Sequence, residues 1–143
     1  MLKRIPNILS PDLLKTLHEM GHGDEIVIGD GNFPAANYAN RLIRCDGHNI
    51  PDLLAAILEL LPLDTFVDKP VTLMQVVDEQ NEPTPEIWHE YKDILSEFQV
   101  AENQIDHEER FAFYERSKRA YAIIATTEKA LYANIILKKG VIS

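Results

Sequence analysis

Apolar residues recur every three or four positions in three segments of the chain, which is the spacing of one face of a helix. In the first segment, residues 11–20, leucines and a methionine follow Ser10 and Pro11 and precede Gly21. A serine side chain can accept a hydrogen bond from a free backbone N–H, and proline lacks the N–H that would stay unpaired in the first turn. The same spacing predicts helices at residues 53–61 and 84–98, and a fourth helix is predicted at residues 106–119.

The last of these helices has a predicted start, because Asp106 and Glu109 stand three residues apart, as in a capping box. Residues 30–34 combine glycine, asparagine and proline and predict a loop. Short apolar and β-branched runs predict five strands, at residues 25–28, 42–45, 71–77, 121–126 and 132–137. Helices and strands alternate, with two strands in succession at the end, which predicts an α/β fold layered around a mixed sheet.

Composition adds limits on the size, the partners and the compartment of the protein. The 143 residues predict one domain over 1–143, and Cys45, the only cysteine, can form neither an intrachain disulfide nor a cysteine-based metal site. A single cysteine suits the reducing cytoplasm. The net charge of −9 disfavours nucleic acid and anionic membranes as partners, but it does not disfavour a neutral sugar.

The chain contains no segment that predicts export or membrane insertion. Two prolines and an aspartate interrupt the apolar residues that follow the basic start of the chain, so no signal peptide is expected. No run approaches the roughly 18 consecutive apolar residues of a membrane span.

The most unusual candidate for chemistry is His22, which stands between Gly21 and Gly23 where a predicted helix gives way to a strand. Loops at such junctions often carry function in α/β proteins. By itself, however, the pattern also fits a surface histidine in a helix C-terminal turn with a glycine cap. Asp30 follows the same strand, and taken alone it fits a turn former as well as a ligand.

Other kinds of site fit the sequence less well. His18 and His22 have the spacing of two zinc ligands on a helix, but Gly21 should end the helix between them and no third ligand is evident. Gly29 and Gly31 lack the third glycine of a dinucleotide-binding loop. Asn134 stands out because it interrupts an apolar strand pattern, so its side chain must find polar partners or point into a site.

Three blocks of the sequence resemble the fucose mutarotase / ribose pyranase family. They are Gly-His-Gly-Asp-Glu-Ile-Val-Ile at 21–28 with Asp30 and Asn-Phe-Pro-Ala at 32–35, Arg-Phe-Ala-Phe-Tyr-Glu-Arg at 110–116, and Tyr-Ala-Asn-Ile-Ile-Leu-Lys-Lys-Gly-Val at 132–141. The similarity runs over essentially the whole chain. The first two blocks are similar to the fucose branch of the family, whereas the third is shared with the ribose branch.

The resemblance implies a single RbsD-like domain of three α/β/α layers with a mixed sheet of about six strands. It also implies that His22 is the catalytic acid/base and that Asp30, Arg110, Tyr132 and Asn134 bind the sugar. No metal or other cofactor is expected. The implied assembly is a homo-oligomeric ring, commonly a decamer, with sites near subunit boundaries.

The implied activity is that of an isomerase that interconverts the α and β anomers of L-fucose by acid/base-catalysed ring opening and closure. A D-ribose pyranase, which interconverts pyranose and furanose rings by the same opening, is an alternative within the family. A monosaccharide-binding module without catalysis and a plain interaction protein are alternatives from other classes.

Overall fold

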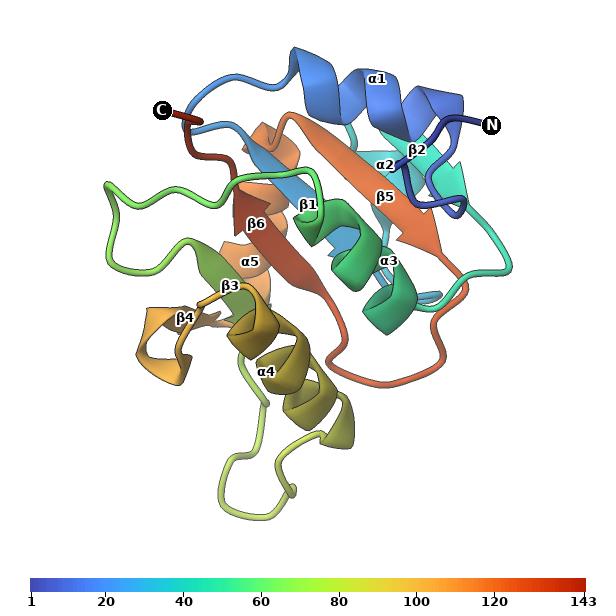
Figure 1. Cartoon of the computed structure of the whole chain (residues 1–143). Coiled ribbons are helices and arrows are strands. Elements are labelled where there is room, and N and C mark those ends of the chain that lie inside the picture. The colour runs from blue at the N-terminus through green and yellow to red at the C-terminus, as the bar shows by residue number, and fades with distance from the viewer.

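A six-stranded mixed sheet forms the centre of the computed structural model, which describes all 143 residues. The strand order across the sheet is β2-β5-β1-β6-β3-β4 (Figure 1). The strands are β1 (Glu25–Gly29), β2 (Leu42–Cys45), β3 (Val71–Met74), β4 (Ile105–Glu108), β5 (Ala122–Thr126) and β6 (Ile135–Lys138). Strands β1, β3 and β5 are buried along almost their whole length, in keeping with their apolar sequences.

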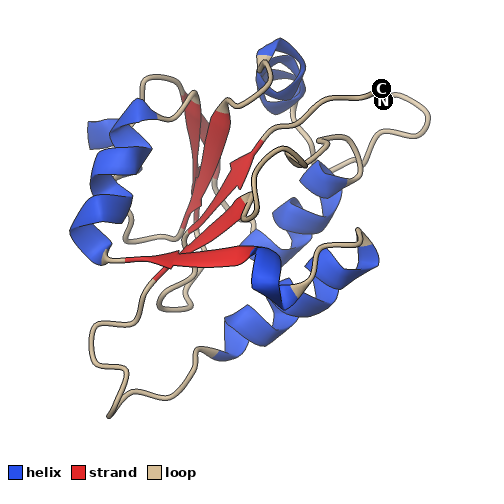
Figure 2. Ribbon diagram, turned by 90° about the vertical axis from the view of Figure 1, so that its left-hand side faces the viewer, coloured by secondary structure: helices blue, strands red, loops and turns tan.

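Helices cover both faces of this sheet, and Figure 2 shows the sheet edge-on between them. The helices are α1 (Pro11–Glu19), α2 (Ala35–Tyr38), α3 (Ile50–Leu58), α4 (Glu86–Glu97) and α5 (Arg110–Arg119). The larger core cluster contains residues of α1, α3 and α4, and the smaller cluster contains residues of α2 and α5. The predicted three-layer α/β/α architecture is therefore confirmed. None of the helices combines the length and the apolar character needed to span a membrane.

Strand β6 runs antiparallel to both of its neighbours, whereas the other paired strands run parallel. In the pairing of β1 with β6, Ile28 lies opposite Ile135 and Glu25 lies opposite Lys138. The end of β1 therefore meets the start of β6. This brings Asp30 and Asn134 to the same end of these two central strands, while His22 precedes the opposite end of β1.

Local sequence accounts for several of the observed helix boundaries. The Ser10 hydroxyl accepts a hydrogen bond from the Leu13 N–H, as its position before Pro11 predicts. The Asn49 side chain caps α3 in the same way, by accepting from the Asp52 N–H. Both helices carry proline in the first turn, where no backbone donor is lost.

The prediction that a helix begins near Asp106 is wrong. Residues 105–108 form strand β4, which pairs with β3, and α5 begins only at Arg110. The Glu109 carboxylate accepts from the backbone N–H groups of Phe111 and Ala112, so Glu109 is the N-cap and not the third residue of a capping box. Pairing with β3 decides the conformation of residues 105–108, because it satisfies backbone groups that a local cap would otherwise serve.

The strand predicted over 132–137 begins three residues later, at Ile135. Tyr132 has a φ of 56°, in the left-handed region that a strand does not use. The predicted strand at 71–77 likewise ends at Met74. Asn134 thus precedes a strand, which explains how asparagine is tolerated beside an apolar run.

Candidate functional site

A cavity of about 250 Å³ opens where β1 ends and β6 begins. Its volume lies below the ~300–1,000 Å³ typical of pockets for drug-sized ligands, so it suits a ligand smaller than a typical drug molecule. Four of the five residues singled out from the sequence line it together. The lining residues are Asp30, Asn32, Phe33, Met74, Val77, Glu82, Arg110, Tyr114, Leu131, Tyr132 and Asn134.

Asp30 and Asn134 form the polar floor of this cavity. Both are buried, and Asn134 Oδ1 accepts from the Asp30 N–H at 2.7 Å, while Asp30 Oδ1 accepts from the Asn32 N–H at 2.9 Å. The other polar atom of each side chain, Asp30 Oδ2 and Asn134 Nδ2, has no bond within the protein and remains accessible. The floor thus offers one acceptor and one donor to a ligand. Burial raises the pKa of the Asp30 carboxyl above its usual range.

Tyr132 forms one wall and links it to the loop after β3. Its hydroxyl accepts from the Val77 N–H at 3.3 Å and lies 3.4 Å from Glu82 Oε1, to which it can donate. Glu82 therefore contributes a second carboxylate to the edge of the cavity. The aromatic ring of Tyr132 offers an apolar surface beside a polar tip.

Helix α5 supplies another part of the wall, through Arg110 and Tyr114. Arg110 lies in its first turn and donates through Nε to the Tyr114 hydroxyl at 3.2 Å. Tyr114 in turn packs edge-on against Phe33, with ring centroids 5.7 Å apart. This packing orients Tyr114, and Arg110 keeps further N–H donors for a ligand.

His22 lies at the other end of β1 and does not line this cavity. Its Nε2 is 3.0 Å from Asp64 Oδ1, and its ring contacts Phe66 with centroids 5.2 Å apart. The five residues of β1 extend over about 17 Å, so His22 of one chain cannot reach a ligand bound at Asp30 of the same chain. The structure brings together four of the five predicted residues and leaves out the histidine.

The contact between Asp64 and His22 joins a buried carboxylate to a partly exposed imidazole. The Asp64 side chain is 4% exposed, against 44% for His22, and Oδ1 also accepts from the Phe66 N–H at 3.0 Å. The Phe66 backbone N–H, with His22, lowers the pKa of the Asp64 carboxyl, although burial opposes this. An ionised Asp64 orients the imidazole through Nε2 and favours the tautomer that carries its proton on that nitrogen.

Sequence reasoning missed Asp64 and Tyr114. Tyr114 follows Arg110 by four residues on one helix face, so that spacing was a usable signal. Asp64 stands 42 residues after His22, and no local pattern connects them. The chain contains no group of three His, Cys, Asp or Glu side chains placed to hold a metal ion.

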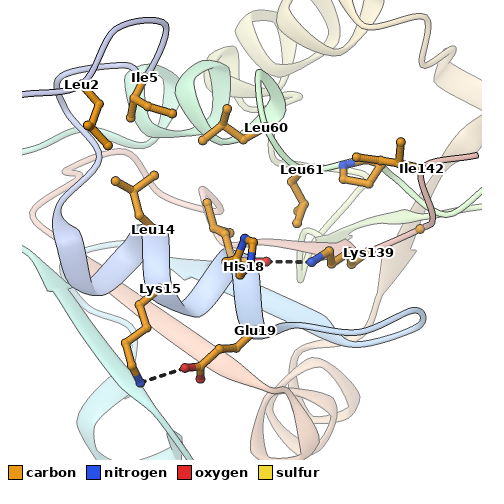
Figure 3. A pocket seen from close by; sticks show the side chains of 13 residues that line it. Leu2, Ile5, Leu14, Lys15, His18, Glu19, Leu60, Leu61, Lys139 and Ile142 are labelled. Atoms are coloured by element: carbon orange, nitrogen blue, oxygen red, sulfur yellow. Dashed lines mark hydrogen bonds and ion pairs between the residues drawn. The ribbon is translucent and has the colours of Figure 1, made fainter.

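A larger cavity, of about 770 Å³, lies along α1 and is lined by none of the five predicted residues (Figure 3). Most of its lining is apolar, including Leu14, Leu60 and Ile142. Three of the charged side chains in its wall already have partners: Lys139 Nζ donates to two carbonyls at the end of α1, and Lys15 pairs with Glu19. A ligand rich in hydroxyls would find few free partners there, so the smaller cavity is the better candidate.

Comparison with known proteins gives consistent matches over the whole chain. Residues 3–142 match the RbsD / FucU transport protein family. The fucose mutarotase of Mus musculus is 50% identical over 97% of this chain and 94% of its own length. The crystal structure of the fucose mutarotase of Streptococcus pneumoniae in complex with L-fucose is 56% identical, with a TM-score of 0.95 over 99% of this chain and all of the other.

The ribose branch is more distant from this chain. The structure of Bacillus subtilis RbsD complexed with D-ribose is 28% identical, with a TM-score of 0.76 over the full length of both chains. The sequence blocks that indicated the fucose branch therefore agree with the comparisons.

Proposed function

Because this chain belongs to the RbsD / FucU transport protein family, we propose that it is an isomerase that interconverts the α and β anomers of L-fucose. The observation that carries the proposal is the identity of about half of all residues, over nearly full length, with proteins named fucose mutarotase. The cavity at Asp30 and Asn134 supports it, because it offers a donor and an acceptor between two aromatic walls. That combination suits a small neutral ligand with several hydroxyl groups.

The reaction requires two proton transfers and no change of oxidation state. Opening the cyclic hemiacetal adds a proton to the ring oxygen and removes one from the anomeric hydroxyl, and closure on the other face reverses both. Imidazole is well suited because its ordinary pKa lies close to neutrality. We assign His22 as the acid/base, which for a positioned group typically contributes about 10²–10⁴-fold.

The cavity residues bind and orient the sugar. Asp30 Oδ2 accepts from one sugar hydroxyl, and Asn134 Nδ2 donates to another. Arg110 donates through its free N–H groups, while Tyr132 forms the wall that carries a hydroxyl tip. These four roles rest on the cavity geometry together with the family resemblance.

Because His22 does not line the cavity of its own chain, we infer that a neighbouring subunit completes each site. A second copy of the chain that presents its His22 to the cavity would unite the imidazole with the sugar-binding residues. Exposed apolar side chains lie at both places: Phe66 is 75% exposed beside His22, and Val77 and Leu131 are 73% and 68% exposed at the cavity. Covering such side chains favours association. We therefore propose a homo-oligomeric ring, such as a decamer, in the cytoplasm.

Proton NMR saturation transfer between the two anomers of L-fucose tests the activity directly. The wild-type protein should accelerate exchange, and His22→Ala should lower the rate at saturating sugar by about 10²-fold or more, with little change in sugar affinity. His18→Ala is the matched control, because His18 is an exposed histidine on α1, outside the candidate site.

Each outcome separates the candidate functions. Exchange at the wild-type rate in His22→Ala would show that the imidazole is not the acid/base. Sugar binding without accelerated exchange by the wild-type protein would indicate a binding module instead. Faster interconversion of D-ribose than of L-fucose would favour the pyranase.

A further inference from the structure

Helix α4 contacts the segment from Tyr132 to Asn134, although no residue of α4 lines the cavity. The connection from β5 to β6 passes beside α4 (Figure 1). We propose that Trp88 and Tyr91 are positioning residues, which hold the segment from Tyr132 to Asn134 in the conformation that binds the sugar. The inference rests on the proposed function, since it concerns the same cavity.

Two consecutive backbone carbonyls of the segment accept hydrogen bonds from α4. Trp88 Nε1 donates to the Tyr132 carbonyl at 2.8 Å, and the Tyr91 hydroxyl donates to the Ala133 carbonyl at 2.6 Å. Both donors are buried, and their spacing of three residues places them on one face of the helix. Because water has little access to these bonds, losing one leaves a buried polar group without a partner.

The bonds matter because Tyr132 has an unfavourable backbone conformation. Its φ of 56° places it in the left-handed region, where the Cβ of a non-glycine residue crowds the following carbonyl. Such a conformation persists only where the surroundings enforce it, and it occurs often at ligand sites. Here the enforcing contacts include the two donors of α4, which fix the carbonyl at Tyr132 and the next one.

The conformation sets the position of the two binding side chains on either side of Ala133. The Tyr132 hydroxyl contacts Val77 and Glu82. Oδ1 of the buried Asn134 accepts from the Asp30 N–H at 2.7 Å. If Tyr132 relaxes to a negative φ, its ring leaves the cavity wall and the approach to Asn134 changes. Only the fraction of molecules in the left-handed conformation then binds sugar, so the apparent affinity falls by that fraction.

Tyr91→Phe tests this with a minimal change, because it removes one hydroxyl and keeps the ring that fills the core. We expect the dissociation constant for L-fucose to rise about tenfold, as for the loss of one buried hydrogen bond. The exchange rate at saturating sugar should fall much less, since bound sugar selects the competent conformation. Thr16→Val is the matched control, because it removes a buried hydroxyl that donates to the Asp12 carbonyl at 2.9 Å within α1.

Trp88 provides a second measurement, because it is the only tryptophan and gives a single indole N–H resonance. Adding L-fucose to the wild-type protein should shift this resonance as the bond to the Tyr132 carbonyl tightens. In Tyr91→Phe the same shift should require about tenfold more sugar. Trp88→Phe, which removes the other donor, should raise the dissociation constant in the same way.

The outcomes distinguish this inference from the proposed function. If the wild-type protein neither binds L-fucose nor speeds anomer exchange, the proposed function fails and the inference fails with it. If the wild-type protein does both but folded Tyr91→Phe binds as tightly as Thr16→Val, only the positioning role is overturned. An indole resonance that stays unchanged when sugar saturates the site would also overturn it.

Discussion

Mixing two inactive variants provides a direct test of a site shared between chains. His22 precedes β1 and Asp30 follows it, so the whole length of this five-residue strand, about 17 Å, lies between them. His22→Ala keeps an intact cavity but no imidazole, whereas Asp30→Asn keeps the imidazole but an impaired cavity. If each site takes Asp30 from one chain and His22 from its neighbour, some sites in a mixed oligomer contain both native residues.

The size of the restored activity follows from counting neighbours. In an equal mixture assembled at random, a site is intact when its cavity comes from a His22→Ala chain and its imidazole from an Asp30→Asn chain. These independent choices each have a probability of one half, so about a quarter of the sites should be intact, whether the interface is two-fold or head-to-tail. Co-expressed or jointly refolded chains, assayed by NMR exchange of L-fucose anomers, should therefore recover about a quarter of the wild-type rate.

A matched mixture shows whether the recovery depends on which end of β1 is changed. Asp64 contacts His22 within the same chain at 3.0 Å, so His22→Ala and Asp64→Asn impair the same half of the site. Their mixture should give no intact sites and no recovery beyond the sum of the parents. If the His22→Ala and Asp30→Asn mixture also fails to recover, the two residues do not act across a subunit boundary and the shared site is wrong.

Two further predictions concern stability. Burial raises the pKa of Asp30, so the fold favours its neutral form and loses stability as pH rises from about 4, the ordinary carboxyl pKa, through the raised value. Asp30→Asn should therefore weaken sugar binding yet raise the melting temperature at pH 7 by a few degrees. Thermal unfolding of both proteins from pH 4 to 8 measures this. A higher melting temperature for the wild type at pH 7 would contradict the prediction. Arg116 bonds Glu25, Thr72 and Glu108 and is 17% exposed, as is Glu25. Arg116→Met leaves the partly buried Glu25 unpaired and should cost about 2–3 kcal/mol in denaturant unfolding, less than the ~3–5 kcal/mol of a fully buried pair, whereas a loss similar to that of an exposed pair would refute this.

Patterns within a few residues of each other predicted much of the fold. Ser10 and Pro11 mark the start of α1, and the apolar runs before Gly29 and Thr126 are the buried strands β1 and β5. The family resemblance, drawn from three blocks of sequence, is confirmed by the full-length matches. Such signals are readable because capping, periodicity and burial depend on neighbouring residues in the chain.

Two local interpretations were wrong because pairing between distant segments outweighed local preference. Asp106 appeared to begin a helix, but residues 105–108 pair with β3 and the helix begins after Glu109. Tyr132 appeared to begin a strand, but it adopts a left-handed conformation whose carbonyl is bonded to Trp88. Neither contact has a signature in the surrounding sequence.

The sequence by itself determined the layers of the fold, the family and the identity of the candidate residues. Only the tertiary structure decided how they are grouped: antiparallel β6 brings Asn134 to Asp30, and the length of β1 separates His22, which lies beside Asp64, from both. The physical reason is that strand order, strand direction and long-range hydrogen bonds result from packing the whole chain. Residues that act together at such a site need share no spacing along the sequence.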